Sequence, residues 1–358
     1  MNMKKLAACV LAGGGIFVSG AASAVPLPST GFFTYGNANS YSLPILAYQY
    51  DAVNGGGVGP GNPYYVNSTP GSIQDQLVIY TGSSGTGVTT NAAGFDDAYQ
   101  TPNGKQDPYA SIGENLGVVD PTPKGGIENN LANTWDANLA ALKAFLDGGS
   151  AQFMFNNNDT NSDQNLAAWA KVWLTDGLGD VYENRFLYFS NRGQAYGAGG
   201  EPNGDATLYN PGNIEPLVGD LAATDMVLSG GAICVDAVGA TIHFGACIPA
   251  DSGGTTINHN LGANQAAYAI VSPLLDQWLS ALFALADDEL SKFTMHVDLR
   301  LGCATEAWLD CADLAIDNGY EQLFLTSSRF VGAVPEPSTI ALLALSMLGM
   351  AGIRRRKA

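Results

Sequence analysis

The sequence predicts a β-rich body of the α+β class: an elaborated, jelly-roll-like β-sandwich with two or three helices. Glycine is abundant, at 44 of 358 residues, and only 13% of the residues are charged, which suits turns and short strands better than a helical bundle. Apolar residues recur in short runs, some with the alternation that a half-buried strand requires. No fixed-period repeat is visible, so a solenoid or a propeller is not expected.

The predicted strands are short apolar or alternating runs between turn-forming residues. They occupy residues 45–50, 77–81, 151–156, 168–174, 185–190, 293–301 and 322–327. The run 293–301 alternates strictly and places Thr294, His296 and Asp298 on one polar face. We interpret this face as solvated; pairing of His296 with Asp298, as a general base and its orienting acid, is the alternative.

Two capped helices interrupt the strands. The first begins at Thr134 as the N-cap, has Asp136 in its first turn and ends at Gly148-Gly149. Its apolar face carries Leu139, Leu142, Phe145 and Leu146. The second helix runs from Pro273, a residue suited to a first turn, to about Asp287.

The amino-terminal residues have the three parts of a secretory signal peptide. Lys4 and Lys5 give a positive start, residues 6–18 form an apolar run, and Ala22 and Ala24 are small residues that a signal peptidase accepts. The apolar run is too short and too glycine-rich for a permanent membrane helix. We therefore expect cleavage after Ala24.

The carboxy-terminal residues form a second address signal. Pro335, Glu336 and Pro337 precede an apolar run at 340–353, and a basic cluster follows. The cluster consists of Arg354, Arg355, Arg356 and Lys357. As a helix, the apolar run would cover about 21 Å of a hydrocarbon core of about 30 Å, so it is a marginal span. We expect a transient association with the inner membrane, with the basic cluster on the cytoplasmic side.

These three parts, in this order, resemble the PEP-CTERM sorting signal of Gram-negative bacteria. In that family a membrane-embedded exosortase recognises and cleaves the signal, and the body is released outward. The resemblance implies export through the inner membrane to the cell surface or extracellular matrix, with signal peptidase and exosortase as processing partners. Segments 134–142, 153–162 and 318–324 also resemble a group of exported PEP-CTERM proteins without an assigned activity.

The chain thus divides into a signal peptide (1–24), a β-rich extracellular body (25–333) and a sorting tail (334–358). Its formal net charge is −18, and the body is more acidic still because basic residues are concentrated in the two signals. Such a body repels nucleic acid and anionic lipid, so no nucleic-acid partner is expected, and it suits divalent cations.

Four cysteines lie in the body: Cys234, Cys247, Cys303 and Cys311. An even number in an exported chain predicts disulfides. Of the three possible pairings we favour the local one, because residues 234–247 resemble two short strands around a glycine turn. A zinc site of four thiolates is the alternative, but neither pair has the C-x(2–4)-C spacing that it prefers.

An Asn- and Asp-rich loop is a candidate calcium site. Asp159, Asn161 and Asp163 place oxygen ligands at every second position, as a calcium-binding loop begins. Gln164 replaces the turn glycine and Ala170 replaces the bidentate glutamate of that motif. The alternative is a connection whose side chains bond their own backbone. Calcium apart, no cofactor is predicted.

Two tryptophans are a candidate carbohydrate platform. Trp169 and Trp173 share one face of the predicted strand 168–174, about 13 Å apart. Such a pair can stack on sugar rings, which would suit a partner such as exopolysaccharide. The alternative is that a helix covers this face, since sheets bury tryptophan readily.

No motif of a known catalytic mechanism is present in the body, and its three histidines lack metal-binding spacing. We therefore expect a non-enzymatic exported protein with a structural or interaction role in an exopolysaccharide or biofilm matrix. A carbohydrate- or calcium-binding module is the first alternative, and a secreted hydrolase is the second.

Overall fold

The structure is a computed structural model of the whole chain. It describes residues 25–29, 31–35, 37–67, 77–82, 91–101, 109–111, 126–131, 134–157, 168–190, 232–262, 265–302 and 321–328. The expected signal peptide and sorting tail lie outside these ranges. Among the helices that the described ranges contain, none has the length and apolarity to cross a membrane.

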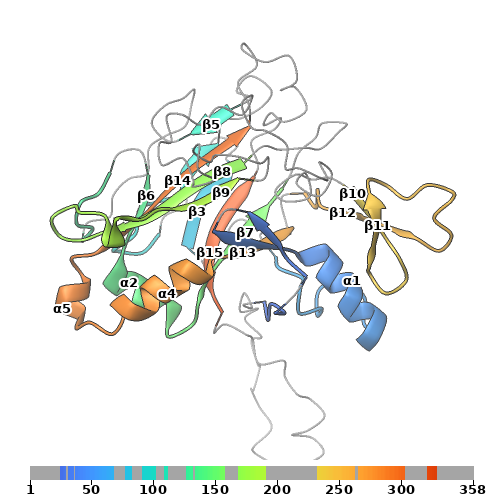
Figure 1. Cartoon of the computed structure of the whole chain (residues 1–358), viewed down its shortest axis with the longest axis horizontal. Coiled ribbons are helices and arrows are strands. Elements are labelled where there is room, and N and C mark those ends of the chain that lie inside the picture. Colours follow the sequence, from blue (N-terminus) through green and yellow to red (C-terminus); the bar gives the residue numbers. More distant parts are fainter. Residues whose placement is uncertain are drawn as a thin grey trace, which may run out of the picture.

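A seven-stranded sheet forms one layer of the body (Figure 1), in the order β1-β2-β13-β7-β15-β3-β4. The strands are β1 (Phe33–Tyr35), β2 (Ala38–Ser42), β13 (Tyr268–Val271), β7 (Ala151–Asn156), β15 (Gln322–Ser327), β3 (Leu77–Gly82) and β4 (Tyr99–Thr101). Neighbouring strands are antiparallel except β3 and β4, which are parallel.

A second, antiparallel sheet faces the first and contains β5 (Tyr109–Ser111), β14 (Thr294–Gly302), β8 (Ala168–Thr175) and β9 (Leu187–Ser190) in that order. A further strand, β6 (Trp135–Asn138), also pairs with β14. Apolar side chains of both sheets, such as Phe155 of β7 and Leu299 of β14, belong to one buried core. The two sheets therefore pack face to face as a sandwich.

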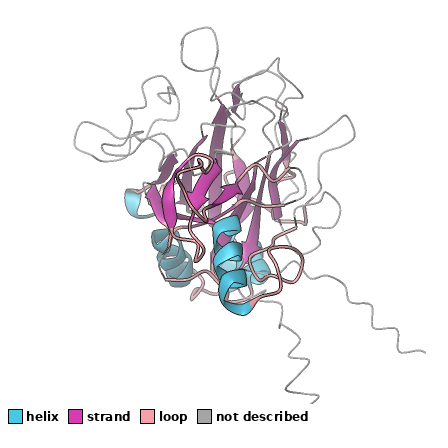
Figure 2. Cartoon of the chain, turned by 90° about the vertical axis from the view of Figure 1, so that its right-hand side faces the viewer, coloured by secondary structure: helices cyan, strands magenta, loops and turns pink. Residues whose placement is uncertain are grey.

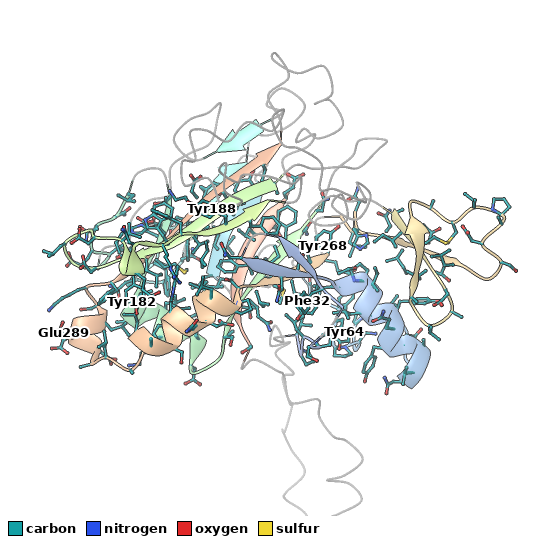
Figure 3. All side chains as sticks on the ribbon, in the orientation of Figure 1. Phe32, Tyr64, Tyr182, Tyr188, Tyr268 and Glu289 are labelled. Atoms are coloured by element: carbon teal, nitrogen blue, oxygen red, sulfur yellow. A yellow bond between two sulfur atoms is a disulfide. The ribbon has the colours of Figure 1, made fainter. Side chains whose placement is uncertain are left out.

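Helices cover the body toward one end (Figure 2). They are α1 (Leu43–Asn54), α2 (Leu139–Leu146), α4 (Pro273–Leu282) and α5 (Asp287–Leu290), with a 3-10 turn, η1 (Tyr182–Asn184). Leu43 and Leu46 of α1 pack against Met154 and Phe324 on the outer face of the seven-stranded sheet. Tyr182 of η1 packs edge-on against Trp278 of α4, beside the second sheet (Figure 3).

A small third sheet projects beside α1 (Figure 1), in the order β11 (Thr241–Phe244), β10 (Ala232–Val235) and β12 (Thr255–Asn258). Among the side chains that the structure describes, its hydrophobic cluster consists of Ile233, Val235 and Ile257, against which Ile45 and Tyr48 of α1 pack. A Cys234–Cys247 disulfide joins β10 to the end of the β11 hairpin. This bond confirms the predicted local pairing, while Cys303 and Cys311 lie outside the described residues.

The sequence predictions hold for the fold class and for most strands. The body is a β-rich α+β structure of several antiparallel sheets. Residues 151–156 and 322–327 form β7 and β15 with the predicted bounds, and the runs at 77–81, 168–174, 185–190 and 293–301 match β3, β8, β9 and β14 to within two residues at each end.

The strand predicted at 45–50 is wrong, because these residues lie in the helix α1. The Ser42 hydroxyl accepts the backbone N–H of Ile45 and caps the helix, and Pro44 fits its first turn. Leu43, Leu46 and Ala47 are buried at helical spacing. The helix start is therefore set by residues upstream of the run that suggested a strand.

Two predicted helix ends also need correction. The cap of α2 is Asn138, whose side chain accepts the N–H groups of Ala140 and Ala141, while Thr134 precedes a strand. The chain after Leu282 leaves the helix and forms the separate short helix α5 from Asp287. The end of α2 agrees with the prediction: Asp147 is left-handed and Gly148 has φ +79°.

The disulfide should hold the third sheet together, because three buried apolar side chains make a weak core. Closing a loop of this size is worth about 3 kcal/mol. We expect the double variant Cys234→Ser/Cys247→Ser to speed amide hydrogen exchange in β10 and β11 by about a hundredfold. Exchange in β7 and β15 of the same sample is the internal control. Unchanged exchange in β10 would contradict this role.

Candidate functional site

A buried chain of hydrogen bonds crosses three neighbouring strands of the second sheet. His296 of β14 contacts the Asp136 carboxylate of β6 through Nδ1, at 2.8 Å from Oδ1. Its other ring nitrogen, Nε2, lies 2.8 Å from Oγ1 of Thr175 in β8. Because a carboxylate only accepts, Nδ1 carries a proton, and a neutral ring then accepts the Thr175 hydroxyl at Nε2. The three side chains cross-link β6, β14 and β8.

The Asp136 carboxylate is the centre of this network. Oδ1 also accepts the Thr134 hydroxyl at 2.6 Å, and Oδ2 accepts the backbone N–H of Leu131 at 2.6 Å. Three donors therefore converge on the Asp136 carboxylate: Nδ1 of His296, the Thr134 hydroxyl and the Leu131 N–H. The Asp136 N–H donates to Oδ2 of Asp96 at 2.9 Å, which links the network to a second buried acid.

Asp96 titrates near neutrality. Burial, followed by repulsion from the Asp136 carboxylate, raises the pKa of Asp96 to about 7. Hydrogen bonds from the Asp136 N–H and the Asn130 side chain oppose this rise without cancelling it. The backbone carbonyl of Asp96 accepts the indole N–H of Trp135, so this segment is held from both sides of β6.

The Thr175–His296–Asp136 chain has the order of a nucleophile, a base and an orienting acid. A nucleophile must also reach its substrate. His296 and Asp136 are 0% exposed and Thr175 is 4% exposed. The order of the hydrogen bonds is therefore that of a catalytic triad. The burial of all three side chains is instead typical of a structural cross-link.

This network was only partly anticipated. His296 was predicted either to be solvated or to pair with Asp298; it is buried, and the acid it contacts is Asp136. Thr294 and Asp298, on the same face, are also buried, so the solvated-face interpretation is wrong. In a strand at 135–138, Thr134 and Asp136 lie on the same face. This alternation was the sequence signal for the site, and it was missed because a helix was predicted from Thr134.

A second histidine has a similar setting in the seven-stranded sheet. His259 is buried, and its Nε2 lies 2.7 Å from Oγ of Ser42, the residue that caps α1. Its ring stacks on Tyr268 of β13, with centroids 5.2 Å apart. This histidine ties the chain after β12 to the start of α1.

The predicted carbohydrate platform is not formed as expected. Trp173 is only 9% exposed, and its ring stacks on His296 with centroids 5.1 Å apart. The Lys171 ammonium lies 4.8 Å from the centroid of the same ring. Burial, the alternative interpretation, therefore applies to Trp173; the Trp169 side chain lies outside the described residues.

The predicted calcium ligands Asp159, Asn161 and Asp163 lie outside the described residues. Within the described ranges, one group of potential metal ligands converges, with atoms within 4.8 Å: Cys234, Cys247 and Asp251. Both sulfurs of this group are used by the disulfide. It therefore offers no thiolates to a metal while the disulfide is intact, and the zinc alternative does not apply to this pair.

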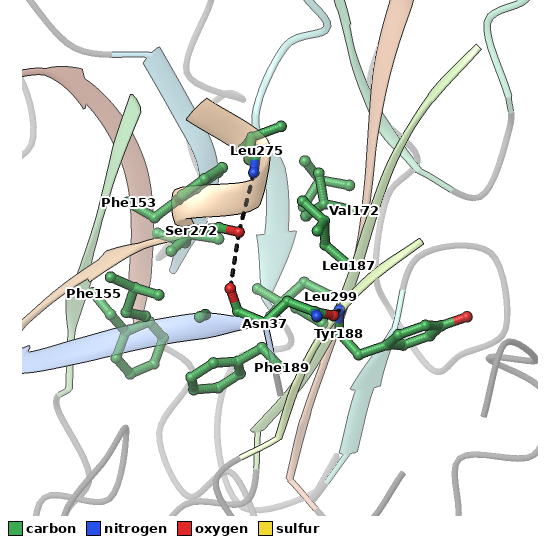
Figure 4. Close-up of a pocket in the computed structure, with 15 residues that line it drawn as sticks. Asn37, Phe153, Phe155, Val172, Leu187, Tyr188, Phe189, Ser272, Leu275 and Leu299 are labelled. Carbon is green, nitrogen blue, oxygen red and sulfur yellow. Dashed lines mark hydrogen bonds between the residues drawn. The ribbon is translucent and has the colours of Figure 1, made fainter. Parts of the chain in front are cut away.

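An apolar cavity lies between the two large sheets (Figure 4). The side chains of Phe153 and Phe155 from β7 face those of Val172, Leu187 and Leu299 from the second sheet across it. The volume that the centre of a water molecule can occupy in this cavity is about 60 Å³. No residue of the His296 network lines it.

Hydrogen bonds around Asn37 close the sandwich beside this cavity. The Asn37 N–H donates to the Tyr188 carbonyl at 2.9 Å, and its Oδ1 accepts the Tyr188 N–H at 3.0 Å. The Asn37 carbonyl accepts the hydroxyl of Ser272, which caps α4 by accepting the N–H of Leu275. One residue between β1 and β2 thus joins the first sheet to β9 and α4.

Comparison with known families assigns the body. A family model described as a domain of unknown function, DUF8239, matches residues 24–300. The chain belongs to the DUF8239 family. The matched region contains β1 to β13, α4, α5 and most of β14, and hence every member of the His296 network. No curated protein and no solved structure matches this DUF8239 chain.

A second match covers the carboxy-terminal residues of the DUF8239 chain. The PEP-CTERM protein-sorting motif matches residues 333–357, which include Pro335, Glu336 and Pro337 and the basic cluster. This confirms the sorting signal predicted from the sequence. The chain is an exported protein that passes the inner membrane to the cell surface and is processed by an exosortase.

Proposed function

We propose that the chain acts outside a Gram-negative cell as a non-catalytic structural or interaction protein of the exopolysaccharide or biofilm matrix. Signal peptidase and exosortase would process its two ends, with transient inner-membrane association through the apolar run at 340–353. The mature body would then associate with exopolysaccharide. The sorting motif at 333–357 supports this destination.

The observation that carries the proposal is the burial of the two histidines whose side chains the structure describes. A general base must approach the proton that it removes to within hydrogen-bond distance. His296 and His259 are both 0% exposed, and their contacts are to Asp136, Thr175 and Ser42 of the body itself. These side chains are suited to holding strands together in a durable extracellular fold.

Charge and covalent structure support the same role. The chain carries 33 acidic and 15 basic residues, which favours solubility and disfavours binding to nucleic acid or anionic lipid. The Cys234–Cys247 disulfide is of a kind that persists in oxidising compartments outside the cytosol. A carbohydrate- or calcium-binding module remains the alternative for the same address, although the buried Trp173 gives it no support.

A secreted hydrolase has one observation in its favour, the order of hydrogen bonds in the Thr175–His296–Asp136 chain. Thr175→Val separates the two functions, because it removes the hydroxyl while nearly preserving the volume of the side chain. In a matrix protein this variant loses a hydrogen bond and keeps its function. Turnover of a polysaccharide by the purified chain that Thr175→Val abolishes in a folded protein would overturn the proposal.

The proposed location and role can be tested in the host cell. We expect the wild-type chain in the extracellular matrix fraction, and a variant with Pro335, Glu336 and Pro337 replaced by alanine in the membrane fraction. The purified wild-type protein should sediment with exopolysaccharide extracted from that matrix. Recovery of the wild-type protein from matrix-free medium alone, together with no sedimentation, would contradict a matrix role.

A further inference from the structure

We infer that the cavity between the two large sheets binds a small, uncharged apolar molecule or group, such as a short alkyl chain or a single aromatic ring. Protein interiors seldom contain voids larger than a water molecule. In this cavity the volume available to the centre of a water molecule is about 60 Å³, which is about four times the volume needed to hold one water. It lies in the middle of the sandwich, between β7 and β13 on one side and β8, β9 and β14 on the other.

The chemistry of the walls selects the ligand. Almost all atoms that face the cavity are carbon, and they come from aromatic and branched side chains. They include Phe153, Phe155, Phe189, Leu187, Ile270 and Leu299. A charged or strongly hydrogen-bonding molecule would lose its hydration here without compensation. Water is disfavoured for the same reason, since a buried water needs two to four polar partners.

The Ser272 hydroxyl and the Asn37 side-chain oxygen beside the cavity already bond other groups of the fold. The Ser272 hydroxyl donates to the Asn37 carbonyl and accepts the N–H of Leu275, as the dashed lines in Figure 4 show. The Asn37 side chain accepts the N–H of Tyr188. The site therefore recognises shape and apolar surface, and we expect little discrimination by hydrogen bonding.

Three half-buried residues mark the mouth that we assign to the cavity. Most lining residues are buried, whereas Ala170, Val172 and Asn37 are half-buried. Ala170 and Val172 lie on the same face of β8 as buried Leu174, which belongs to the core between the sheets. We therefore expect a small molecule to enter beside these half-buried residues.

The test uses the purified full chain and two apolar probes, toluene for a ring and hexane for an alkyl chain. We expect each binding probe to raise the thermal unfolding temperature, and the comparison of the two shows whether a ring or a chain fits. Benzoate and hexanoate, which add a carboxylate to the same groups, should give no rise. A rise with benzoate or hexanoate equal to that with the neutral probes would overturn an apolar cavity site.

Two variants place the binding in this cavity. Ala170→Leu and Val172→Phe add atoms at the half-buried mouth and should weaken probe binding at least tenfold. Val53→Leu is the matched control, because Val53 is 84% exposed on α1 and outside the cavity. Should both filling variants fail to fold, Leu187→Ala enlarges the cavity and should strengthen toluene binding. No temperature rise in the wild type with either neutral probe, or unchanged binding in the folded variants, would refute the inference.

Discussion

We expect Asp136→Ala to destabilise the folded body by about 3–5 kcal/mol, the cost typical of removing one partner from a buried ionic or hydrogen-bonded network. The substitution leaves the Leu131 N–H and Nδ1 of His296 without their acceptor, and it leaves the Thr134 hydroxyl with only its 3.4 Å contact to the Leu131 carbonyl. Each unsatisfied buried donor costs about 1–3 kcal/mol, and the separate costs are not additive because the donors share one carboxylate. Urea unfolding followed by tryptophan fluorescence measures the effect.

Asp136→Asn separates the loss of hydrogen bonds from the loss of packing. The amide retains one oxygen for the Thr134 and His296 donors, but its NH₂ group then faces the Leu131 N–H. We expect a smaller loss, about 1–2 kcal/mol. Asp180→Ala, at an exposed turn residue, is the control and should change stability by less than about 0.5 kcal/mol. An effect of Asp136→Ala as small as that of the control would show that the network contributes no net stability.

The network shows why the sequence predicts this fold better than its site. Strict alternation correctly separates His296 from Met295 and Val297 along β14. Alternation does not tell what covers the polar side, because that depends on residues distant in the chain. Asp136 lies 160 residues before His296, and β6 brings the two together only after both strands have paired.

Local signals were sufficient where the interacting residues are close in sequence. The Cys234–Cys247 disulfide closes a hairpin with a sequence separation of 13, so its pairing follows from a turn within the segment. Residues 151–156 form a strand as predicted, because an apolar run follows a glycine helix stop. The helix α1 was not predicted because the aromatic and branched residues at 45–50 favour a strand. The cap at Ser42 favours a helix, and the structure follows the cap.

The apolar cavity belongs to the class of features that a single sequence does not reveal. Its walls come from strands of both sheets, and each contributing residue is an ordinary core residue in its own strand. The cavity results from the distance between the two sheets, which the bond between Asn37 and Tyr188 helps to set at the edge of the sandwich. Strand periodicity gives the inward face of each layer, while the volume between the layers depends on how all of them pack.

A second large effect is a fall in stability between about pH 4 and pH 7 that depends on Asp96. Its pKa rises from 3.8 to about 7 in the folded protein, chiefly through burial and then through the nearby Asp136 carboxylate. In this pH range the unfolded chain has lost the proton that the folded state still holds. The stabilising contribution of Asp96 is therefore complete below about pH 4 and is lost by about pH 7. At about 1.4 kcal/mol per pKa unit, the loss is at most about 4 kcal/mol.

Asp96→Asn should remove this part of the pH dependence, because the amide oxygen can still accept the Asp136 N–H but the group cannot ionise. Burial also raises the pKa of Asp276 to about 6, so the variant should retain a smaller fall that ends near pH 6. Urea unfolding at pH 4, 5.5, 7 and 8 compares it with the wild type and with Asp288→Asn on the exposed face of α5. Differences between variants at each pH are decisive, because other carboxylates add their own dependence. If all three profiles coincide, Asp96 ionises in the folded protein at no cost, and the buried acid pair would have to be hydrated rather than enclosed.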